Sequence, residues 1–241
     1  MATLPPVNPP ELSPPARLQM AWGERAESDY LFNFWTAIGW SVLTFGIFAL
    51  YILYQLVRRM RDHNRRRLEL LDAARTMAWD EAVARGQSEE LRGSFERLAG
   101  HLEVMRVMLG DFRDPVIWVL ISIIARGIVD IIVLILNDVD VVRHGHAESG
   151  AEGELDAIFG RLGVPLPPAN PVLDKARQNY VGRIVATVVS FGIYGFWWLA
   201  DVMRQGNAHF EANWAWEDAL VGGTIGGPAP PPGPAPPTGV S

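Results

Sequence analysis

Residues 41–47 read Ser-Val-Leu-Thr-Phe-Gly-Ile, and related heptapeptides return at 122–128 (Ser-Ile-Ile-Ala-Arg-Gly-Ile) and at 187–193 (Thr-Val-Val-Ser-Phe-Gly-Ile). Each copy lies inside a long apolar run. A histidine follows each glycine by seventeen residues, and an Asp-Ala pair follows later, at 72–73, 156–157 and 218–219. Ordered features that recur in three places indicate a triplicated unit.

The composition excludes some classes of protein. The 241 residues include no cysteine, which excludes disulfides and thiolate metal sites. The net charge of -6 gives no basis for nucleic-acid binding. Residues 1–16 are rich in proline and have neither a basic start nor an apolar core, so we expect membrane insertion to rest on the first internal apolar run.

The three apolar runs predict an all-α integral membrane protein with three repeated hydrophobic helical units. The first run, 30–57, is long enough at 1.5 Å per residue to cross a hydrocarbon core of about 30 Å. Two topologies fit the repeats. Each unit crosses once, or each unit is a re-entrant hairpin that turns at its Gly-Ile, with the irregular backbone buried in protein.

Changes in composition divide the chain into seven segments. We predict a Pro-rich N-terminal arm (1–29), membrane unit 1 (30–57), a basic helical segment (58–114), membrane unit 2 (115–137), an acidic, Pro-containing loop (138–179), membrane unit 3 with an amphipathic flank (180–221) and a disordered Gly/Pro-rich tail (222–241). Of the 21 Lys and Arg residues, 12 lie between 58 and 114, which places this segment in the cytoplasm by the positive-inside rule.

The third copy continues as Tyr-Gly-Phe-Trp-Trp, residues 194–198. With its preceding aliphatic-Thr-x-Gly-Ile pattern, it resembles an uncharacterised family of small bacterial integral membrane proteins. The first copy matches in part and the second, Gly-Ile-Val-Asp at 127–130, departs further. The resemblance implies a helical membrane domain, in a bacterial inner membrane, and it brings no catalytic residues.

Two features of the 58–114 segment suggest surfaces. Its arginines predict an anchor to lipid headgroups, and they are Arg58, Arg59, Arg61, Arg65, Arg66 and Arg67. An apolar stripe with spacings of four and three follows, and it comprises Leu91, Phe95, Leu98, Leu102, Met105 and Leu109. The stripe fits an amphipathic helix packed on a neighbour, and it also fits a coiled-coil seam that joins chains.

Charges and glycines inside the apolar runs are the other candidates. Arg126 and Asp130 are one helical turn apart near the middle of the second run, so they form an internal ion pair, line an ion or proton path, or place Arg126 at a hairpin turn. Gly46, Gly127 and Gly192 allow close helix packing or kinks, with a substrate site as the alternative.

His63, His144 and His209, with His146 nearby, raise the question of a metal site, because histidine is a common metal ligand. Histidines at a membrane boundary are usually solvated, so we expect no metal and no cofactor. The sequence contains no recognisable catalytic motif. We therefore expect a non-enzymatic membrane scaffold or accessory subunit, or alternatively a small channel or transporter subunit using Arg126 and Asp130. The expected partners are the lipid bilayer and other membrane proteins or further copies of the chain.

Overall fold

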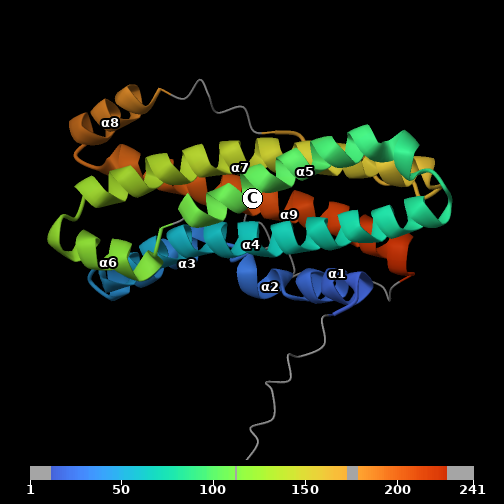
Figure 1. The fold of residues 1–241 in the computed structure, drawn as a ribbon. Helices are drawn as coiled ribbons and strands as arrows, with labels where there is room; N and C mark the ends of the chain where they lie inside the picture. The colour runs from blue at the N-terminus through green and yellow to red at the C-terminus, as the bar shows by residue number, and fades with distance from the viewer. Residues whose placement is uncertain (1–11, 112, 173–178, 227–241) are drawn as a thin grey trace, which may run out of the picture.

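The computed structural model describes residues 12–111, 113–172 and 179–226. Within these residues the chain forms nine helices (Figure 1). Four long helices build an elongated bundle, namely α4 (Ile47–Ala84), α5 (Ser88–Asp111), α7 (Ile128–Arg161) and α9 (Ile193–Ile225). The short helices α1 (Pro14–Gly23) and α2 (Arg25–Ser28) pack along α4.

Each repeated unit is a helical hairpin made of a short helix, a glycine turn and a long helix. The short helices are α3 (Phe34–Leu43), α6 (Pro115–Ile124) and α8 (Tyr180–Val189), and α4, α7 and α9 start directly after the glycines. The side chain before each short helix accepts an N–H from its first turn, as N-cap residues do, and these caps are Asn33, Asp114 and Asn179. The triplication read from the sequence is therefore also a triplication of structure.

The turn of the first unit is built from Phe45 and Gly46, which both have positive φ, 50° and 87°. The N–H of Gly46 donates to the carbonyl of Ser41 (2.7 Å), and that of Phe45 donates to the carbonyl of Val42 (3.1 Å). This pair of bonds is the Schellman arrangement that ends many helices. The third unit repeats it, with Phe191 at φ 52°. The chain thus stops one helix and starts the next within three residues.

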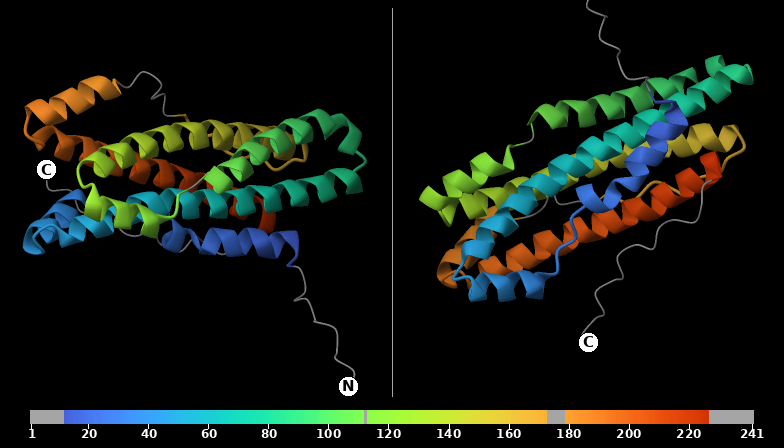
Figure 2. Two further views of the ribbon diagram at one scale, coloured as in Figure 1. Left: turned by 60° about the vertical axis from the view of Figure 1, so that its left-hand side comes forward. Right: turned by 90° about the horizontal axis from the view of Figure 1, so that it is seen from below.

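All three hairpin turns lie at one end of the bundle, and α4, α7 and α9 run from that end in the same direction (Figures 1 and 2). Helix α5 returns antiparallel to α4. The core of the far half contains apolar residues of α1, α4, α5, α7 and α9, and a second apolar cluster joins the three hairpins. Because the long helices are parallel, residues at equal distances from the three glycines lie at equal heights in the bundle.

The prediction of an integral membrane protein is wrong. No helix among residues 12–111, 113–172 and 179–226 combines the length and the apolar character needed to cross a membrane. The reason is local: each apolar run is divided by its glycine turn, and each long helix becomes polar after its first turns. The predicted inner-membrane location, with residues 58–114 cytoplasmic, is wrong for the same reason.

The stripe of the 58–114 segment lies inside the molecule. Its first five residues, Leu91 to Met105, are buried in the core, and Leu109 is partly buried against it. Helix α5 packs its stripe between α4 and α7. Of the two interpretations, packing on a neighbouring helix of the same chain describes this stripe, and no seam is left for a coiled coil with another chain.

Several predicted segment boundaries also differ. The acidic stretch after residue 137 continues α7 as far as Arg161, because the acidic side chains at 148 and 152 face partners in the bundle instead of water. Residues 14–28 of the Pro-rich arm form α1 and α2, and α9 extends to Ile225. The remainder of the predicted arm, 1–11, and of the predicted tail, 227–241, lies outside the described residues.

Candidate metal centre

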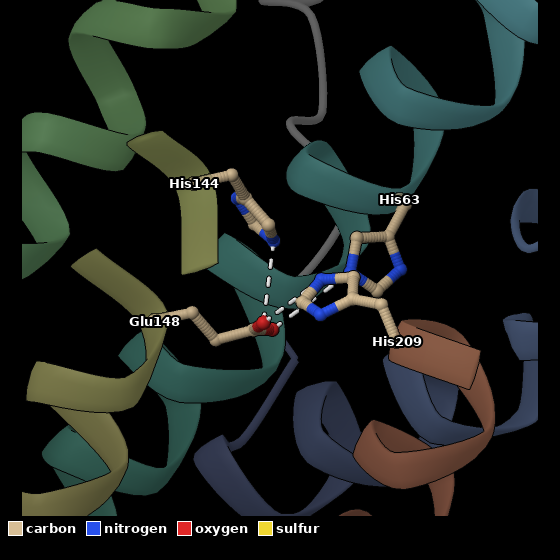
Figure 3. A group of neighbouring side chains, drawn as sticks. All are labelled: His63, His144, Glu148 and His209. Atoms are coloured by element: carbon tan, nitrogen blue, oxygen red, sulfur yellow. Dashed lines mark ion pairs between the residues drawn. The ribbon is translucent and has the colours of Figure 1, made fainter. Parts of the chain in front are cut away.

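Three histidines meet at the centre of the bundle. His63 lies on α4, His144 on α7 and His209 on α9, each seventeen residues after its glycine turn (Figure 3). Their ring centroids lie 5.1 to 5.5 Å apart. His63 and His144 have no exposed side-chain surface, and His209 has very little. The triplicated sequence and the parallel helices together make this convergence.

Glu148 completes the group from one helical turn after His144. Its carboxylate lies 3.8 Å from Nε2 of His63, 3.4 Å from Nε2 of His144 and 3.2 Å from Nε2 of His209. One ligand atom from each of the four residues falls within 4.8 Å of all the others. A tetrahedral zinc ion, with bonds of about 2.0–2.1 Å, holds its donor atoms about 3.3 Å apart.

The outer nitrogens of two rings are held by fixed acceptors. Nδ1 of His63 lies 2.9 Å from Oδ1 of Asp29, and Nδ1 of His144 lies 2.8 Å from Oδ1 of Asn64. An acceptor on Nδ1 fixes the proton there and leaves Nε2 with a free lone pair directed at Glu148. Histidine ligands of metals are usually oriented in this way.

Asp29 is itself fixed by three donors. Its carboxylate accepts hydrogen bonds from Arg66 (2.7 Å), from the indole N–H of Trp214 (2.7 Å) and from the hydroxyl of Ser28 (2.6 Å). Burial opposes its ionisation, but the charge of Arg66 and the hydrogen bonds from His63 and Ser28 hold the pKa of Asp29 well below its usual range. Asp29 is therefore a carboxylate at neutral pH and a firm acceptor for His63.

Burial keeps two of the imidazoles neutral. It lowers the pKa of His63 to about 4 and that of His209 to about 3, even though Glu148 favours the charged form of both rings. A neutral imidazole can donate a lone pair to a metal ion, whereas an imidazolium cannot. These two rings are therefore in the ligand form at neutral pH.

The position twenty-one residues after each glycine forms a second polar layer, made of Arg67, Glu148 and Asn213. Arg67 donates to Glu148, to Glu152 (2.5 Å) and to Glu217 (3.1 Å). The contact with Glu148 uses Oε1, so Oε2 stays directed at His144 and His209. The position seventeen residues after the glycine is histidine in all three units. The position twenty-one residues after the glycine differs between the units, and its three side chains are complementary in charge and hydrogen bonding.

The buried network carries more negative than positive charge. Within the described part of the chain, the guanidinium groups of Arg66 and Arg67 face four carboxylates, those of Asp29, Glu148, Glu152 and Glu217. Burial raises the pKa of Glu152 to about 7, although Arg67 acts in the opposite direction. A divalent cation beside Glu148 would add positive charge to a network in which two guanidinium groups face four carboxyl groups.

Hydrogen bonds alone satisfy this centre incompletely. The amide Nδ2 of Asn213 donates to Oε2 of Glu148 (2.9 Å) and lies 3.3 Å from Nε2 of both His63 and His209. Nε2 of His144 is buried and has no hydrogen-bond partner among the described residues. A buried lone pair without a donor is costly, and a metal ion in the group would use it.

No family model, no curated protein and no solved structure matches the chain. The resemblance to an uncharacterised family therefore stays a prediction.

The structure separates the other predicted site residues from this centre. Helix α6 ends before Arg126 and α7 begins after Gly127, so Arg126 and Asp130 are not neighbours on one helix. Arg126 donates to the carbonyl of Gly46 (3.1 Å), and Asp130 accepts from the hydroxyl of Ser122 (3.2 Å). The expected i,i+4 ion pair requires a continuous helix, which the turn at Gly127 interrupts.

The predicted arginine anchor is divided between the surface and the interior. Arg59, Arg66 and Arg67 are buried, Arg58 and Arg61 are half-buried, and Arg65 is exposed. Gly206 leaves room for the guanidinium of Arg59, which a Cβ at that position would overlap. Three of the six arginines therefore serve internal contacts and are not available to headgroups.

Sequence reasoning noted the three histidines but set a metal aside, and it missed Glu148 altogether. The equal seventeen-residue spacing was the signal for the histidines. Glu148 gave no such signal, because the matching positions are Arg67 and Asn213. His146, the fourth histidine considered, is exposed on the outer face of α7.

Proposed function

We propose that the protein binds one divalent transition-metal ion, with zinc as the best match, through His63, His144, His209 and Glu148. The observation that supports this most directly is that three histidine Nε2 atoms, each from a different repeat, converge on the carboxylate of Glu148. Nitrogen and carboxylate donors in a four-membered set suit zinc. Magnesium and calcium are disfavoured because they prefer oxygen ligands.

The role we propose for the ion is to fasten the three units together, without catalysis. Catalytic zinc sites use three protein ligands and leave a position for water or substrate, whereas structural sites use four. Here four side chains are available and all are buried or nearly so. This supports the expectation of a non-enzymatic protein with a scaffold role, in which the metal fixes how the repeats are assembled.

Metal content of the purified protein tests the proposal. The full chain, prepared without a histidine tag, is expected to bind one zinc ion per molecule by elemental analysis and by titration calorimetry. His63→Ala, His144→Ala and His209→Ala should each reduce zinc affinity by at least tenfold. The chain offers a matched control, because its only other histidines are His101 and His146 and their replacement by Ala should leave binding unchanged.

Two results would contradict the proposal. One is a wild-type protein that takes up no zinc, manganese, iron, cobalt, nickel or copper ion when folded. The other is zinc binding that is lost in the His101 and His146 variants and retained in the three buried ones.

A further inference from the structure

A second feature, separate from the metal centre, is the end of the bundle where the three hairpins turn. We call residues 34–51, 115–132 and 180–197 the apolar end. Most of the exposed large apolar side chains of the described chain lie in these segments. Phe45 is 97% exposed, Phe191 98% and Ile124 89%. An exposed apolar area that extends over three helical hairpins indicates a binding surface.

The short helices of the apolar end turn apolar side chains outward and bury few of them. Helix α8 has no buried residue, and α3 buries only Ala37. A surface helix in water usually has one polar face, whereas a helix that is apolar all round needs apolar surroundings all round. Here the outward faces of α3, α6 and α8 are apolar instead of polar, and one lipid leaflet can cover all three at once.

The N–H groups of the first and third turns are bonded within their own hairpins, as lipid surroundings require. The N–H groups of Phe45, Gly46 and Ile47 all donate to carbonyls of the same hairpin. The third unit repeats these bonds at residues 191–193. In a hydrocarbon environment an unpaired backbone group costs several kcal/mol, so an irregular turn survives there only with such bonds.

The hydroxyl groups follow the same rule. Ser41 donates to the carbonyl of Ala37 (2.8 Å), Thr44 to that of Trp40 (2.7 Å) and Thr187 to that of Arg183 (2.8 Å). These donors are directed back to the helix and away from the surroundings.

Only three Asp, Glu, Lys or Arg residues occur in the apolar end, and the molecule itself engages each of them. Arg126 bonds to the carbonyl of Gly46, Asp130 accepts from Ser122 and from the N–H of Gly127, and Arg183 pairs with Asp201 (3.0 Å). The surface therefore offers apolar contact almost without charge, and its partner must be apolar too.

We propose that the apolar end docks on a lipid bilayer and inserts into one leaflet. The ten-residue short helices are about 15 Å long, which is half of a hydrocarbon core of about 30 Å. The apolar end thus has the depth of one leaflet, and docking there requires no described helix to cross the bilayer. Phe45 and Phe191 stand at the apex of two hairpins in the left-handed conformation, which is unfavourable for phenylalanine. This strained conformation places each ring at the outermost point of its hairpin.

Flotation with vesicles tests the docking. The purified full chain is added to preformed phosphatidylcholine vesicles, with and without phosphatidylglycerol, at 50 and 500 mM salt as rough extremes of screening. The wild-type protein should float with both kinds of vesicle at both salt concentrations, because the contact is apolar. Absence of flotation, or flotation abolished by salt, would overturn the proposal.

A double variant at the apex locates the contact. Phe45→Asn with Phe191→Asn removes two apolar rings, and asparagine tolerates positive φ, so the fold should be kept. Partition into vesicles should fall at least tenfold. The matched control is Val83→Asn with Val107→Asn, which removes two half-exposed apolar side chains outside the apolar end and should leave partition unchanged. A folded apex variant that floats like the wild type would contradict the proposal.

Two further measurements separate the remaining outcomes. Light scattering without lipid shows whether a second copy of the chain is the partner. If the wild type is an oligomer, the apex variant is a monomer and neither floats, the apolar end serves self-association and the bilayer proposal is wrong. If the apex variant does not fold, vesicles of brominated lipid decide on the wild-type chain. Tryptophan emission should be quenched, since Trp35, Trp40 and Trp197 are exposed at the apolar end, and unquenched emission would refute the insertion.

Discussion

Replacement of Arg67 by Met is the sharpest test of the buried network. Arg67 is fully buried and contacts three carboxylates, those of Glu148, Glu152 and Glu217. Methionine keeps much of the apolar stem and removes the positive charge. The three carboxylates then stay buried without Arg67. Among them, Glu217 keeps a contact with the guanidinium group of Arg66.

The size of the effect follows from the burial. Removal of one partner of a buried ion pair costs about 3 to 5 kcal/mol, because the other charge is left uncompensated. For a chain of this length, 1 kcal/mol changes the unfolding temperature by about 2–4 °C. The Arg67→Met variant should therefore unfold about 6–20 °C below the wild type in the presence of a metal chelator.

Zinc should stabilise this variant more than it stabilises the wild-type protein. In the wild type, Glu148 shares its charge with Arg67, whereas in the variant the whole carboxylate is available to the ion. We expect zinc affinity to rise about tenfold, which corresponds to about 1.4 kcal/mol. Thermal unfolding followed by circular dichroism, with zinc and with chelator, measures both effects.

The neighbouring exposed arginine supplies the control. Arg65→Met removes the same charge from the surface and should change the unfolding temperature by less than about 2 °C. The reasoning would be refuted by an Arg67→Met variant as stable as the wild type, or by equal zinc stabilisation of the two proteins.

Three further predictions concern the metal centre and the core. His63 and His209 should stay neutral down to about pH 5 in the metal-free protein, because burial lowers the pKa of His63 to about 4 and that of His209 to about 3; NMR titration of the two imidazole signals measures this, and protonation of either ring near pH 6.5, as for exposed histidine, would contradict it. Asn213→Asp adds a carboxylate beside the imidazoles and should tighten zinc binding at least tenfold while it lowers the unfolding temperature of the metal-free protein, and weaker zinc binding would speak against an ion at this place. Leu98→Asp buries an unpaired carboxylate in the core and should abolish cooperative unfolding, whereas Val107→Asp on the half-exposed side of α5 should be tolerated; a stable Leu98→Asp variant would show that the stripe is not core.

The sequence determined the repeated unit and its spacing. The heptapeptides place the three turns, the histidines follow at one interval, and the stripe of α5 shows the face that is buried. Local rules suffice here, because a glycine in the left-handed conformation and an apolar residue every three or four positions act through neighbours along the chain.

Hydropathy could not decide whether each apolar run crosses a membrane. A run of apolar residues has the same mean hydropathy whether it forms one helix or a hairpin. What makes the first and third runs hairpins is the turns at 45–46 and 191–192. The sequence showed the glycines, but the phenylalanines with positive φ that reverse the chain are visible only in the structure.

Only the tertiary structure decided which charges are internal. Six arginines in ten residues predict a solvated or lipid-facing surface, yet Arg66 and Arg67 are buried because their carboxylate partners come from α7 and α9, as many as 151 residues away in sequence. Glu148 lies 81 residues after Arg67, and this separation likewise gave no local signal of their contact. A buried charge is stable only beside its partners, and partners on different helices meet only after the three units have packed in parallel.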